Sequence, residues 1–446
     1  MSKIYGITHC YTDLNRGDAE IIIQTIKLIK RVDPNGKILL FSVFGANDKR
    51  FTYEHQYIEK YANGLLPALL PNPLPIFGLG DKSRIIAFAF FLFRALVLLL
   101  TQNKLVLSLL FSRRELSSIT CFCEADVLIS KGGSYITTQN SSARQLVSLM
   151  QMLYPFYLSQ RYNRDYIIFS QSLGPISGSL QRLLVKSALR KVKRVFLRES
   201  ICLKTYPYLK SIVSMKTVSF VPDTAFFHDE SLSLKQDSAS FLSAESLKVG
   251  MTLVDHPFKY LKNPKEVLCK RKSYKESICC LIQYLVNTYS ATVTIYPQVT
   301  IKDPHLGICD TAFAKNIAEN LGDLIDAGRL VVLDGEYSPS ELRKMYGEMD
   351  IFIGTRLHSA IFAMSLGIPV VNISYHGTKS EGVLKAILPG YDLCVDINSL
   401  NPRSLINKCE YVIANRSIIR SRLLTQVPLA HQQLINAMSL IVNKKW

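Results

Sequence analysis

The chain has 446 residues, of which 48% are hydrophobic and 20% charged, a composition that excludes a disordered protein and suffices for two cores. Its formal net charge of +18 favours anionic partners, such as phosphorylated substrates or an anionic lipid surface. Nucleic acid is the weakest of the anionic candidates, because the sequence holds no RNA-binding motif, zinc finger or long basic arm. We therefore expect no nucleic-acid partner.

Ten cysteines are scattered along the chain without any paired CxxC set. Cys121 and Cys123 flank a single residue, which is poor spacing for zinc. This usage is typical of reduced thiols in a cytoplasmic protein, and we predict no bound metal. No basic and apolar leader precedes the apolar run at Lys3–Ile7, so we expect no export.

The first half of the chain alternates short apolar runs with segments of helical periodicity. The runs predict strands at Lys3–Thr8, Lys37–Phe44, Ala125–Ser130, Tyr166–Ser170 and Val195–Leu197. Helices are predicted over Asp18–Arg31 and around Lys186–Lys193. Strands that are separated by helices predict βαβ units and a parallel sheet.

One segment departs from this pattern, an apolar insertion over residues 65–111. Within it Ile85–Leu100 is nearly all apolar, but Arg94 in its middle makes a membrane-spanning helix costly. Two interpretations stay open: a buried helix of the first domain, or a helix that lies on the inner leaflet of a membrane. In the second case four basic residues would lie near anionic headgroups. These are Lys82, Arg84, Arg113 and Arg114.

A Ser-rich stretch, Asp229–Lys248, interrupts the alternation and predicts a linker between domains. Beyond it strands are predicted at Val249–Leu253, Thr292–Tyr296, Leu330–Leu333, Ile351–Gly354 and Val370–Ser374. Helices are predicted around Ser277–Tyr289, Ala312–Leu321 and Pro402–Val442. The pattern predicts an α/β fold of two domains with parallel sheets, residues 1–230 and 249–446.

The segment from Asp350 to Glu381 carries the most chemical information. Arg356 and His358 directly follow the strand Ile351–Gly354 and open a helix that Gly367 ends. Ligands of open α/β sheets bind at this edge, where a helix start attracts anions. Arg356 can hold a phosphate or carboxylate through two parallel hydrogen bonds, and histidine is the side chain that most readily moves protons near neutral pH. The alternative is a structural ion pair or a helix cap.

Further polar or glycine-rich turns lie near predicted strand ends. Lys379 follows the strand Val370–Ser374 and can reach the same edge as Arg356, although an ordinary exposed lysine is the alternative. The first domain contributes Asn15-Arg16-Gly17-Asp18, Lys131-Gly132-Gly133-Ser134, Gln171-Ser172-Leu173-Gly174-Pro175, Arg198-Glu199-Ser200 and Pro222-Asp223. Each of these alone is equally well explained by a tight turn or, at Asp18, by a helix cap.

The order of these segments resembles the polysaccharide pyruvyl transferase family. The resemblance runs from Lys3 to Gly382 and is most specific from Asp350 through Arg356-Leu357-His358 to Tyr375-x-x-x-Lys379. It implies two Rossmann-like halves like those of B-type glycosyltransferases, with the active site in the cleft between them. It also implies phosphoenolpyruvate as the donor substrate, a sugar as the acceptor and a pyruvate ketal on a surface glycan as the product, so we expect no further cofactor.

The same resemblance implies roles for single residues. Arg356 matches the donor-binding arginine and His358 the acid–base histidine, while Lys379 and Arg198 match further donor-binding positions. The acceptor-binding or cleft-lining positions are Asn15, Gly17, Asp18, Gly132, Gly133, Gln171 and Gly174. Two departures concern the acceptor side: two adjacent glycines stand where three are common, and the insertion at 65–111 is unusually hydrophobic.

We hypothesise that His358 gives a proton to the enol carbon of phosphoenolpyruvate while Arg356, Lys379 and Arg198 hold its phosphate and carboxylate. A sugar hydroxyl then attacks the adjacent carbon, with Asp18 or Glu199 as the candidate base. The acceptor is expected to be a sugar or a lipid-linked oligosaccharide. We expect a cytoplasmic protein and leave peripheral contact with an anionic membrane open.

Two alternatives stay open. A base-stacking aromatic residue and a ribose-binding carboxylate near Asp334–Glu341, where Glu336 and Glu341 stand, would favour a B-type glycosyltransferase with a nucleotide-sugar donor. A non-catalytic, membrane-associated partner of a glycan assembly complex would account for the apolar segment and the net charge of +18.

Overall fold

The computed structural model describes residues 2–70, 81–101, 103–213, 215–228, 246–258, 260–302, 308–375 and 377–445. The chain divides into two compact units. Unit 1 comprises Met1–Asp13, Ile21–Thr224 and Gln433–Trp446, and unit 2 comprises Leu14–Glu20 and Ala225–Gln432. Most of the predicted linker, residues 229–245, lies outside the described residues.

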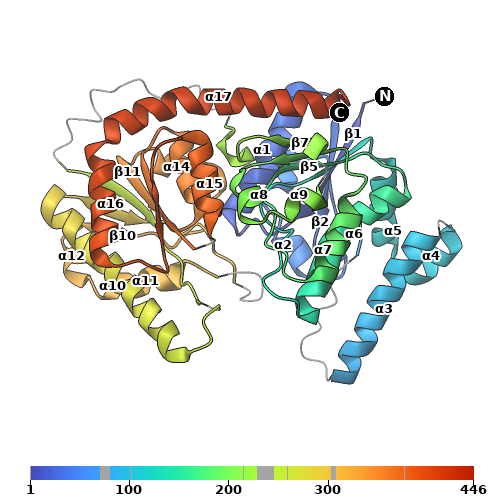
Figure 1. The fold of residues 1–446 in the computed structure, drawn as a ribbon, viewed down its shortest axis with the longest axis horizontal. Helices are drawn as coiled ribbons and strands as arrows, with labels where there is room; N and C mark the ends of the chain where they lie inside the picture. Colours follow the sequence, from blue (N-terminus) through green and yellow to red (C-terminus); the bar gives the residue numbers. More distant parts are fainter. Residues whose placement is uncertain are drawn as a thin grey trace. The chain divides into compact units, whose positions relative to one another are not determined.

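Unit 1 is built on a seven-stranded sheet in the order β3-β2-β1-β4-β5-β6-β7, with every pairing parallel (Figure 1). The strands are β1 (Ile4–Cys10), β2 (Lys37–Ser42), β3 (Gly64–Leu66), β4 (Val127–Ser130), β5 (Tyr166–Gln171), β6 (Arg194–Leu197) and β7 (Val218–Phe220). All five predicted strands are confirmed. The strand order runs outward from β1 in both directions and therefore reverses between β1 and β4.

The helices of unit 1 connect these strands. They are α1 (Arg16–Val32), α2 (Arg50–Tyr53), α3 (Asp81–Leu100), α4 (Lys104–Leu110), α5 (Arg113–Glu124), α6 (Ala143–Arg161), α7 (Ser179–Leu189), α8 (Ile201–Thr205) and α9 (Leu209–Ile212), with 3₁₀ turns η1 (Glu59–Tyr61), η2 (Met215–Thr217) and η3 (Thr224–Phe226). The first residues of α1, up to Glu20, belong to unit 2. α6 packs against both α3 and α7.

The core of unit 1 lies around its central strands. Every residue of β4 and β5 is buried, as expected for a parallel sheet that helices cover on both faces. Phe41 of β2 and Phe122 of α5 meet edge to face, with ring centres 5.7 Å apart. Burying one such side chain contributes about 1.5–3 kcal/mol, so this core fixes the strand ends that carry the loops.

Two strands of unit 1 end irregularly at the carboxyl edge of the sheet. His9 and Ser170 have positive φ values of 64° and 52°, which non-glycine residues rarely adopt. The register of β1 against β2 shifts beside His9, and that of β5 against β6 shifts beside Ser170. Such bulges re-aim the chain. They lie where the predicted polar and glycine-rich loops begin.

Unit 2 is built on a six-stranded parallel sheet in the order β10-β9-β8-β11-β12-β13. The strands are β8 (Lys248–Thr252), β9 (Thr292–Ile295), β10 (Leu330–Val332), β11 (Ile351–Gly354), β12 (Val370–Ser374) and β13 (Cys394–Asp396). Numbered from β8, this is the order 3-2-1-4-5-6 of dinucleotide-binding folds. All five predicted strands are confirmed, and the strand order reverses between β8 and β11.

The helices of unit 2 are α10 (Pro264–Tyr289), α11 (Thr311–Glu319), α12 (Gly322–Asp326), α13 (Pro339–Tyr346), α14 (Leu357–Ser365), α15 (Thr378–Ile387), α16 (Pro402–Ala414) and α17 (Arg416–Val442). α10 packs against α11 and α16, and α13 packs against α14. Three helices start with a capping side chain followed by proline: Asn263-Pro264, Ser338-Pro339 and Asn401-Pro402. α17 ends in residues of unit 1.

The predicted insertion holds α3 and α4, which together with α5 separate β3 from β4. Its residues 71–80 lie outside the described part of the chain. Among the described residues, none of the helices combines the length and the apolar composition that crossing a membrane requires. The prediction of an α/β fold with two parallel sheets is confirmed.

Candidate active site

The turn from β11 to α14 positions two of the predicted site residues. Arg356 stands at the N-cap of α14 with an extended backbone, and its carbonyl accepts a 2.6 Å hydrogen bond from Ser359 Oγ. Gly354 makes this turn possible, because a Cβ atom there would lie 2.8 Å from the same hydroxyl. Arg356 and His358 therefore lie at the carboxyl edge of the sheet, next to β8, where the strand order reverses.

Asp310 holds the Arg356 guanidinium in place. Its Oδ1 accepts from Nη2 at 2.6 Å and from Nε at 3.1 Å, while the Ile308 carbonyl accepts from Nη2 at 2.7 Å and Tyr375 Oη from Nη1 at 3.1 Å. These contacts use four of the five N–H donors of the guanidinium. The sequence suggested that Arg356 makes a pair of hydrogen bonds to a substrate anion, but in the structure Asp310 accepts such a pair. One Nη1–H has no acceptor among the described residues.

Arg356 remains positively charged in the folded chain. Burial alone would lower its pKa, but the Asp310 carboxylate and the Tyr375 hydroxyl outweigh burial and raise the pKa above its ordinary value. Asp310 is almost fully buried and also accepts from the backbone N–H groups of Gln298 and Val299 through Oδ2. The side chain of Arg356 keeps 15% of its surface exposed, so it can still meet a ligand.

His358 is the second residue of α14 and packs on the loop that starts α1. A Cβ atom built on Gly17 would lie 2.2 Å from His358 Nδ1, so this face of the imidazole rests on the glycine backbone. Asn15 caps the same loop: its Oδ1 accepts from Gly17 N at 3.2 Å, and its Nδ2 donates to Asp18 Oδ2 at 2.7 Å. The structure therefore joins the predicted positions Asn15, Gly17 and Asp18 to His358.

Arg16 fastens this loop to the rest of unit 2. It is fully buried, and it donates from Nε to the Tyr337 carbonyl at 2.7 Å and from Nη1 to Thr300 Oγ1 at 2.8 Å. Its own N–H donates to the Gln298 carbonyl at 3.2 Å. The neighbouring Val299 N–H donates to Asp310, the counter-ion of Arg356. The loop Gln298–Val299 therefore contacts both the residue that precedes Gly17 and the carboxylate that holds Arg356.

A second histidine lies beside the Arg356 cluster. His256 follows β8, and its ring centre is 5.2 Å from that of Tyr375 and 4.5 Å from that of Phe258. Its Nδ1 accepts from the Phe258 N–H at 3.3 Å. Burial, and then the charge of Arg356, lower the pKa of His256 below its ordinary value. A neutral imidazole therefore faces the cationic side of the site at neutral pH.

Lys379 lies in the first turn of α15, which begins just after β12, and its side chain is half-buried. Gly377 precedes this helix with a φ of 62°, a conformation that favours glycine. The neighbouring His376 lies outside the described residues. Since β12 pairs with β11, Lys379 and Arg356 follow adjacent strands at the same edge of the sheet.

The predicted site residues of unit 1 follow β4, β5 and β6. A Cβ atom on Gly132 would lie 2.7 Å from the Ser170 carbonyl, and Gly133 forms a bridge with Gln171. Gln171 is fully buried, and its Oε1 has no hydrogen-bond partner among the described residues. A buried polar atom of this kind is expected to meet ordered water or a ligand. Gly174, with a φ of 71°, continues the Gln171 loop.

Arg198 directly follows β6 and is enclosed within unit 1. Only 4% of it is exposed. Its Nη1 lies 2.5 Å from Asp223 Oδ2, and its Nε donates to Ser172 Oγ at 2.8 Å. The adjacent Glu199 is also buried, with Oε2 accepting from Cys202 N at 2.7 Å. The two groups of predicted site residues are each brought together within their own unit.

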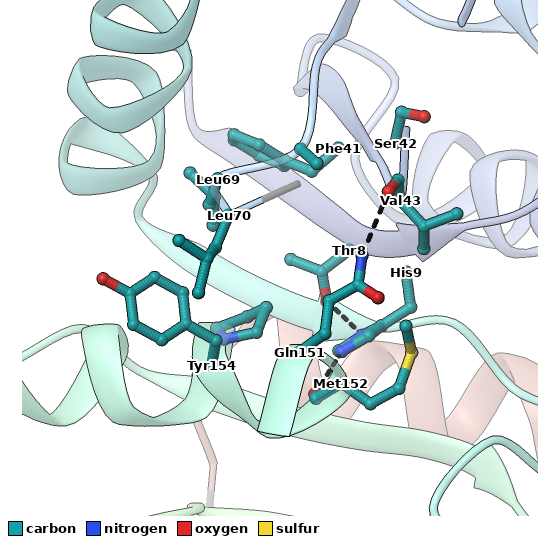
Figure 2. A pocket seen from close by; sticks show the side chains of 12 residues that line it. Thr8, His9, Phe41, Ser42, Val43, Leu69, Leu70, Gln151, Met152 and Tyr154 are labelled. Atoms are coloured by element: carbon teal, nitrogen blue, oxygen red, sulfur yellow. Dashed lines mark hydrogen bonds between the residues drawn. The ribbon is translucent and has the colours of Figure 1, made fainter. Parts of the chain in front are cut away.

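A small cavity of about 30 Å³ lies among β1, β2 and α6 of unit 1, as Figure 2 shows. His9 projects into it, with Nδ1 2.9 Å from Thr8 Oγ1 and Nε2 2.7 Å from the Met152 carbonyl. Gln151 donates to the Val43 carbonyl at 3.2 Å. The volume suits about one water molecule, and the cavity holds none of the predicted site residues.

The carboxylates that a ribose-binding site would use are engaged locally. Glu341 closes a capping box at the start of α13, with Oε2 accepting from Ser338 N and Oγ, each at 2.7 Å. Asp334 pairs with Lys315 at 2.7 Å, and Glu336 pairs with Lys302 at 3.4 Å. The described residues contain no group of three or more His, Cys, Asp or Glu placed to hold a metal ion.

Three residues of the unit 2 cluster escaped the sequence reasoning. Asp310 stands in a region without periodicity, and no sequence signal marked it as the counter-ion of Arg356. His256 comes three residues after the predicted strand Val249–Leu253, so the strand-end rule that selected Arg356 could have found it. Arg16 lay inside a selected motif, but nothing in the sequence showed that it would be buried.

A sequence model of the family described as polysaccharide pyruvyl transferase matches residues 15–377, most of the chain. The chain belongs to this family. The matched range includes the loop around Gly17 and the segment that carries Arg356 and His358. The resemblance inferred from the order of the motifs is thereby confirmed.

One curated relative is the amylovoran biosynthesis protein AmsJ of Erwinia amylovora, 41% identical over 103 residues. This stretch is 22% of the present chain and 24% of the relative, so the chain matches about a quarter of the relative's length. This partial similarity, together with the family model, links the chain to polysaccharide biosynthesis.

Solved structures share the fold across the whole chain. The UDP-GlcNAc 2-epimerase of Neisseria meningitidis, solved with UDP-GlcNAc, has a TM-score of 0.56 at 11% identity and full coverage of both chains (100% and 100%). MurG of Acinetobacter baumannii has a TM-score of 0.50 at 9% identity, with 99% of each chain covered. At these identities the likeness shows the fold alone, and it confirms two Rossmann-like domains of the B-type glycosyltransferase kind.

Proposed function

We propose that this family member transfers the pyruvyl group of phosphoenolpyruvate to two hydroxyls of one sugar in a surface polysaccharide or its lipid-linked precursor. The observation that carries the proposal is the anchored Arg356 with His358 two residues further, at the start of α14. A helix start attracts anions, and an imidazole there can move a proton. This combination suits a donor that carries a phosphate, a carboxylate and a carbon that must be protonated.

The donor would be held mainly by residues of unit 2. Arg356 offers its remaining Nη1–H together with a positive charge that Asp310 keeps in position. Lys379, at the start of the helix that follows the adjacent strand, is proposed as the second cation. Arg198 is the weaker candidate, because Asp223 and Ser172 already satisfy much of its guanidinium inside unit 1.

His358 is proposed to work through Nε2, since its Nδ1 edge rests on Gly17. The protonated imidazole gives its proton to C3 of phosphoenolpyruvate, which becomes a methyl group, and positive charge develops on C2. The oxygen of a first sugar hydroxyl bonds to C2 and loses its proton. The C2–O bond to phosphate then breaks, and a second hydroxyl of the same sugar bonds to C2 and loses its proton. One of the two released protons restores His358, and the other leaves with phosphate.

The base that receives the hydroxyl protons is proposed to be Asp18 or Glu199. Asp18 is partly exposed and held by Asn15 at 2.7 Å, which fixes its carboxylate next to the loop under His358. Glu199 is buried, and one of its oxygens has no partner among the described residues. The exposure of Asp18 makes it the better placed of the two for a sugar.

The proposal is tested by incubating the purified chain with phosphoenolpyruvate and a panel of hexose and N-acetylhexosamine glycosides. The readouts are released phosphate and the mass gained by the glycoside. We expect His358→Asn to lower transfer by a factor of about 10²–10⁴, the usual contribution of acid–base catalysis. His431→Asn is the matched control, because His431 belongs to α17, where its Nε2 lies 2.7 Å from the Phe226 carbonyl.

Full transfer by His358→Asn would remove the acid–base role. Transfer of a sugar from a nucleotide donor, with phosphoenolpyruvate inert, would select the glycosyltransferase alternative instead. Asp334, Glu336 and Glu341 are all exposed, so this assay, and not their local contacts, decides between the two donors.

A further inference from the structure

Helix α3 of unit 1 turns a row of large apolar side chains toward solvent. Ile86, Phe90, Phe93, Leu96 and Leu100 are each at least half exposed, from 50% for Phe90 to 69% for Ile86. At about 100° per residue these five fall within one arc of about 120° on the helix surface. Water-exposed apolar surface of this extent is unfavourable unless another apolar phase covers it.

The opposite side of α3 is anchored to unit 1. Phe91 and Leu98 are buried, and the Ala95 carbonyl accepts from Tyr154 Oη of α6 at 3.0 Å. Arg94, the charge in the middle of the helix, also turns inward. Its Nη2 lies 2.7 Å from Glu115 Oε1, and its guanidinium stacks 4.4 Å from the ring centre of Phe111. Since Arg94 is the only charged residue between positions 86 and 100, the outer arc is uncharged.

Helix α4 continues the exposed apolar surface. Leu105 is 78% and Leu109 is 85% exposed. We call these two side chains, together with the five of α3, the apolar face. Figure 1 shows both helices extending away from the sheet of unit 1. The apolar face therefore lies on elements that the core does not cover.

The sequence around the apolar face is mainly basic, although Asp81 begins α3 and Glu115, which pairs with Arg94, follows Arg114. From Lys82 to Arg114 the sequence holds six basic residues and no acidic one. Arg113 and Arg114, which directly follow α4, are exposed. Basic side chains beside an apolar helix face are the combination that binds anionic lipid, because the apolar groups enter the acyl boundary while the cations meet the headgroups.

We propose that the apolar face docks on the surface of a membrane that contains anionic lipid. A second copy of this chain is the less suitable occupant, because the basic residues of two copies would face each other. A membrane-spanning role does not fit the described helices, since none is long and apolar enough and Arg94 is paired with Glu115. The inference goes beyond the proposed function and does not depend on it.

The test is co-sedimentation of the full chain with vesicles of phosphatidylcholine alone or mixed with phosphatidylglycerol. We expect binding to the mixed vesicles that weakens as salt rises, since salt screens the headgroup charge. The variant Phe93→Gln/Leu96→Gln should bind at least about tenfold more weakly. The matched control is Leu268→Gln/Ile418→Gln, which removes two exposed apolar side chains from α10 and α17 of unit 2 and should leave binding unchanged.

Equal binding by the native chain and by Phe93→Gln/Leu96→Gln would overturn the proposal, as would no binding of the native chain to the mixed vesicles. If the native chain does not bind vesicles but is a dimer in light scattering, and the same variant is a monomer, the apolar face would be assigned to a second copy. Because both substituted side chains are exposed, the variant should keep the melting temperature of the native chain. It should also keep any response to phosphoenolpyruvate, which separates this test from that of the proposed function.

Discussion

At the scale of residues, unit 2 pairs two of its arginines with buried carboxylates, at different places in the fold. Arg356 meets Asp310 at the edge of the sheet, and Arg343 meets Glu20 in the interior, at 2.5 Å and with both side chains almost fully buried. Removing one partner of a buried ion pair is costly, because the other charge stays buried without compensation. The two pairs therefore allow stability and ligand binding to be separated.

We predict that Asp310→Asn lowers the free energy of unfolding by about 3 kcal/mol and abolishes binding of phosphoenolpyruvate, because the Arg356 guanidinium loses the carboxylate that orients it. Glu20→Gln should cost a similar amount of stability and leave binding in place. Urea unfolding and calorimetric titration measure the two effects. Equal affinity for phosphoenolpyruvate in Asp310→Asn and the native chain would contradict the role given to Asp310.

The sequence allowed some site residues to be predicted but not their partners. Arg356 and His358 were found because a predicted strand and a helix start flank them, which are local signals. Asp310 was not found, because its pairing with Arg356 joins positions 46 residues apart and leaves no periodic trace. The pair of hydrogen bonds predicted between Arg356 and a substrate anion is made to Asp310, and only the folded chain reveals this contact.

At the scale of elements, the first turn of α1 and the start of α14 are fitted to each other. Gly17 has no side chain, and His358 fills the space that a Cβ atom would need. Gly322, also in the first turn of a helix, has nothing within 4 Å of the same position. The pair of glycines separates a steric effect on His358 from the general effect of glycine in a helix.

We predict that Gly17→Ala lowers the rate of transfer by about a hundredfold, because a displacement of about 1 Å of a catalytic group has effects of this size. Gly322→Ala should gain about 0.5–1 kcal/mol of stability and keep the native rate. Steady-state kinetics and thermal unfolding of both variants check this. A native rate in Gly17→Ala would show that the position of His358 does not matter.

Elements were predicted best where the signals are local. The predicted strands of both units were found, because buried parallel strands form continuous apolar runs. The short strands β3, β7 and β13 were not predicted, because each contains a glycine, serine or aspartate, whereas the equally short β10 lies in the unbroken apolar run Leu330–Leu333. For the apolar insertion the sequence left a buried helix and a membrane-surface helix open, and α3 combines a buried side with an exposed apolar side.

At the scale of the whole molecule, two buried histidines make the fold sensitive to acid. Burial, and then the charge of Lys131, lower the pKa of His9 to about 3 and that of His55 to about 4. In the unfolded chain both histidines would gain a proton near pH 6.5. Between these values the unfolded state binds more protons than the folded state, so stability falls as the pH falls.

We predict that each of the two histidines removes about 2 kcal/mol of stability between pH 7 and pH 5. His55→Gln should reduce this loss by about that amount, since glutamine does not titrate but can still bond to Ser42, which lies 2.8 Å from His55 Nε2. Urea unfolding at both pH values measures the difference. The same pH dependence in His55→Gln and the native chain would contradict a neutral buried His55.

The two-domain fold could be predicted from alternation of strands and helices, and family membership from the order of the motifs. The boundaries of the compact units could not be predicted from the sequence. The first residues of α1 belong to unit 2 and the last residues of α17 belong to unit 1, while most of each helix belongs to the other unit. Helix periodicity shows which face of a helix is apolar, but it does not show to which unit each end of the helix belongs.

The most direct test of pyruvyl transfer is thermal unfolding of the purified chain with phosphoenolpyruvate, UDP, GDP or inorganic phosphate, repeated with Arg356→Ala. A ligand that binds only the folded state raises the melting temperature. We predict an increase with phosphoenolpyruvate alone, which Arg356→Ala abolishes relative to its own ligand-free melting temperature. An increase with UDP or GDP in place of phosphoenolpyruvate would contradict the proposal and make the chain a nucleotide-dependent glycosyltransferase.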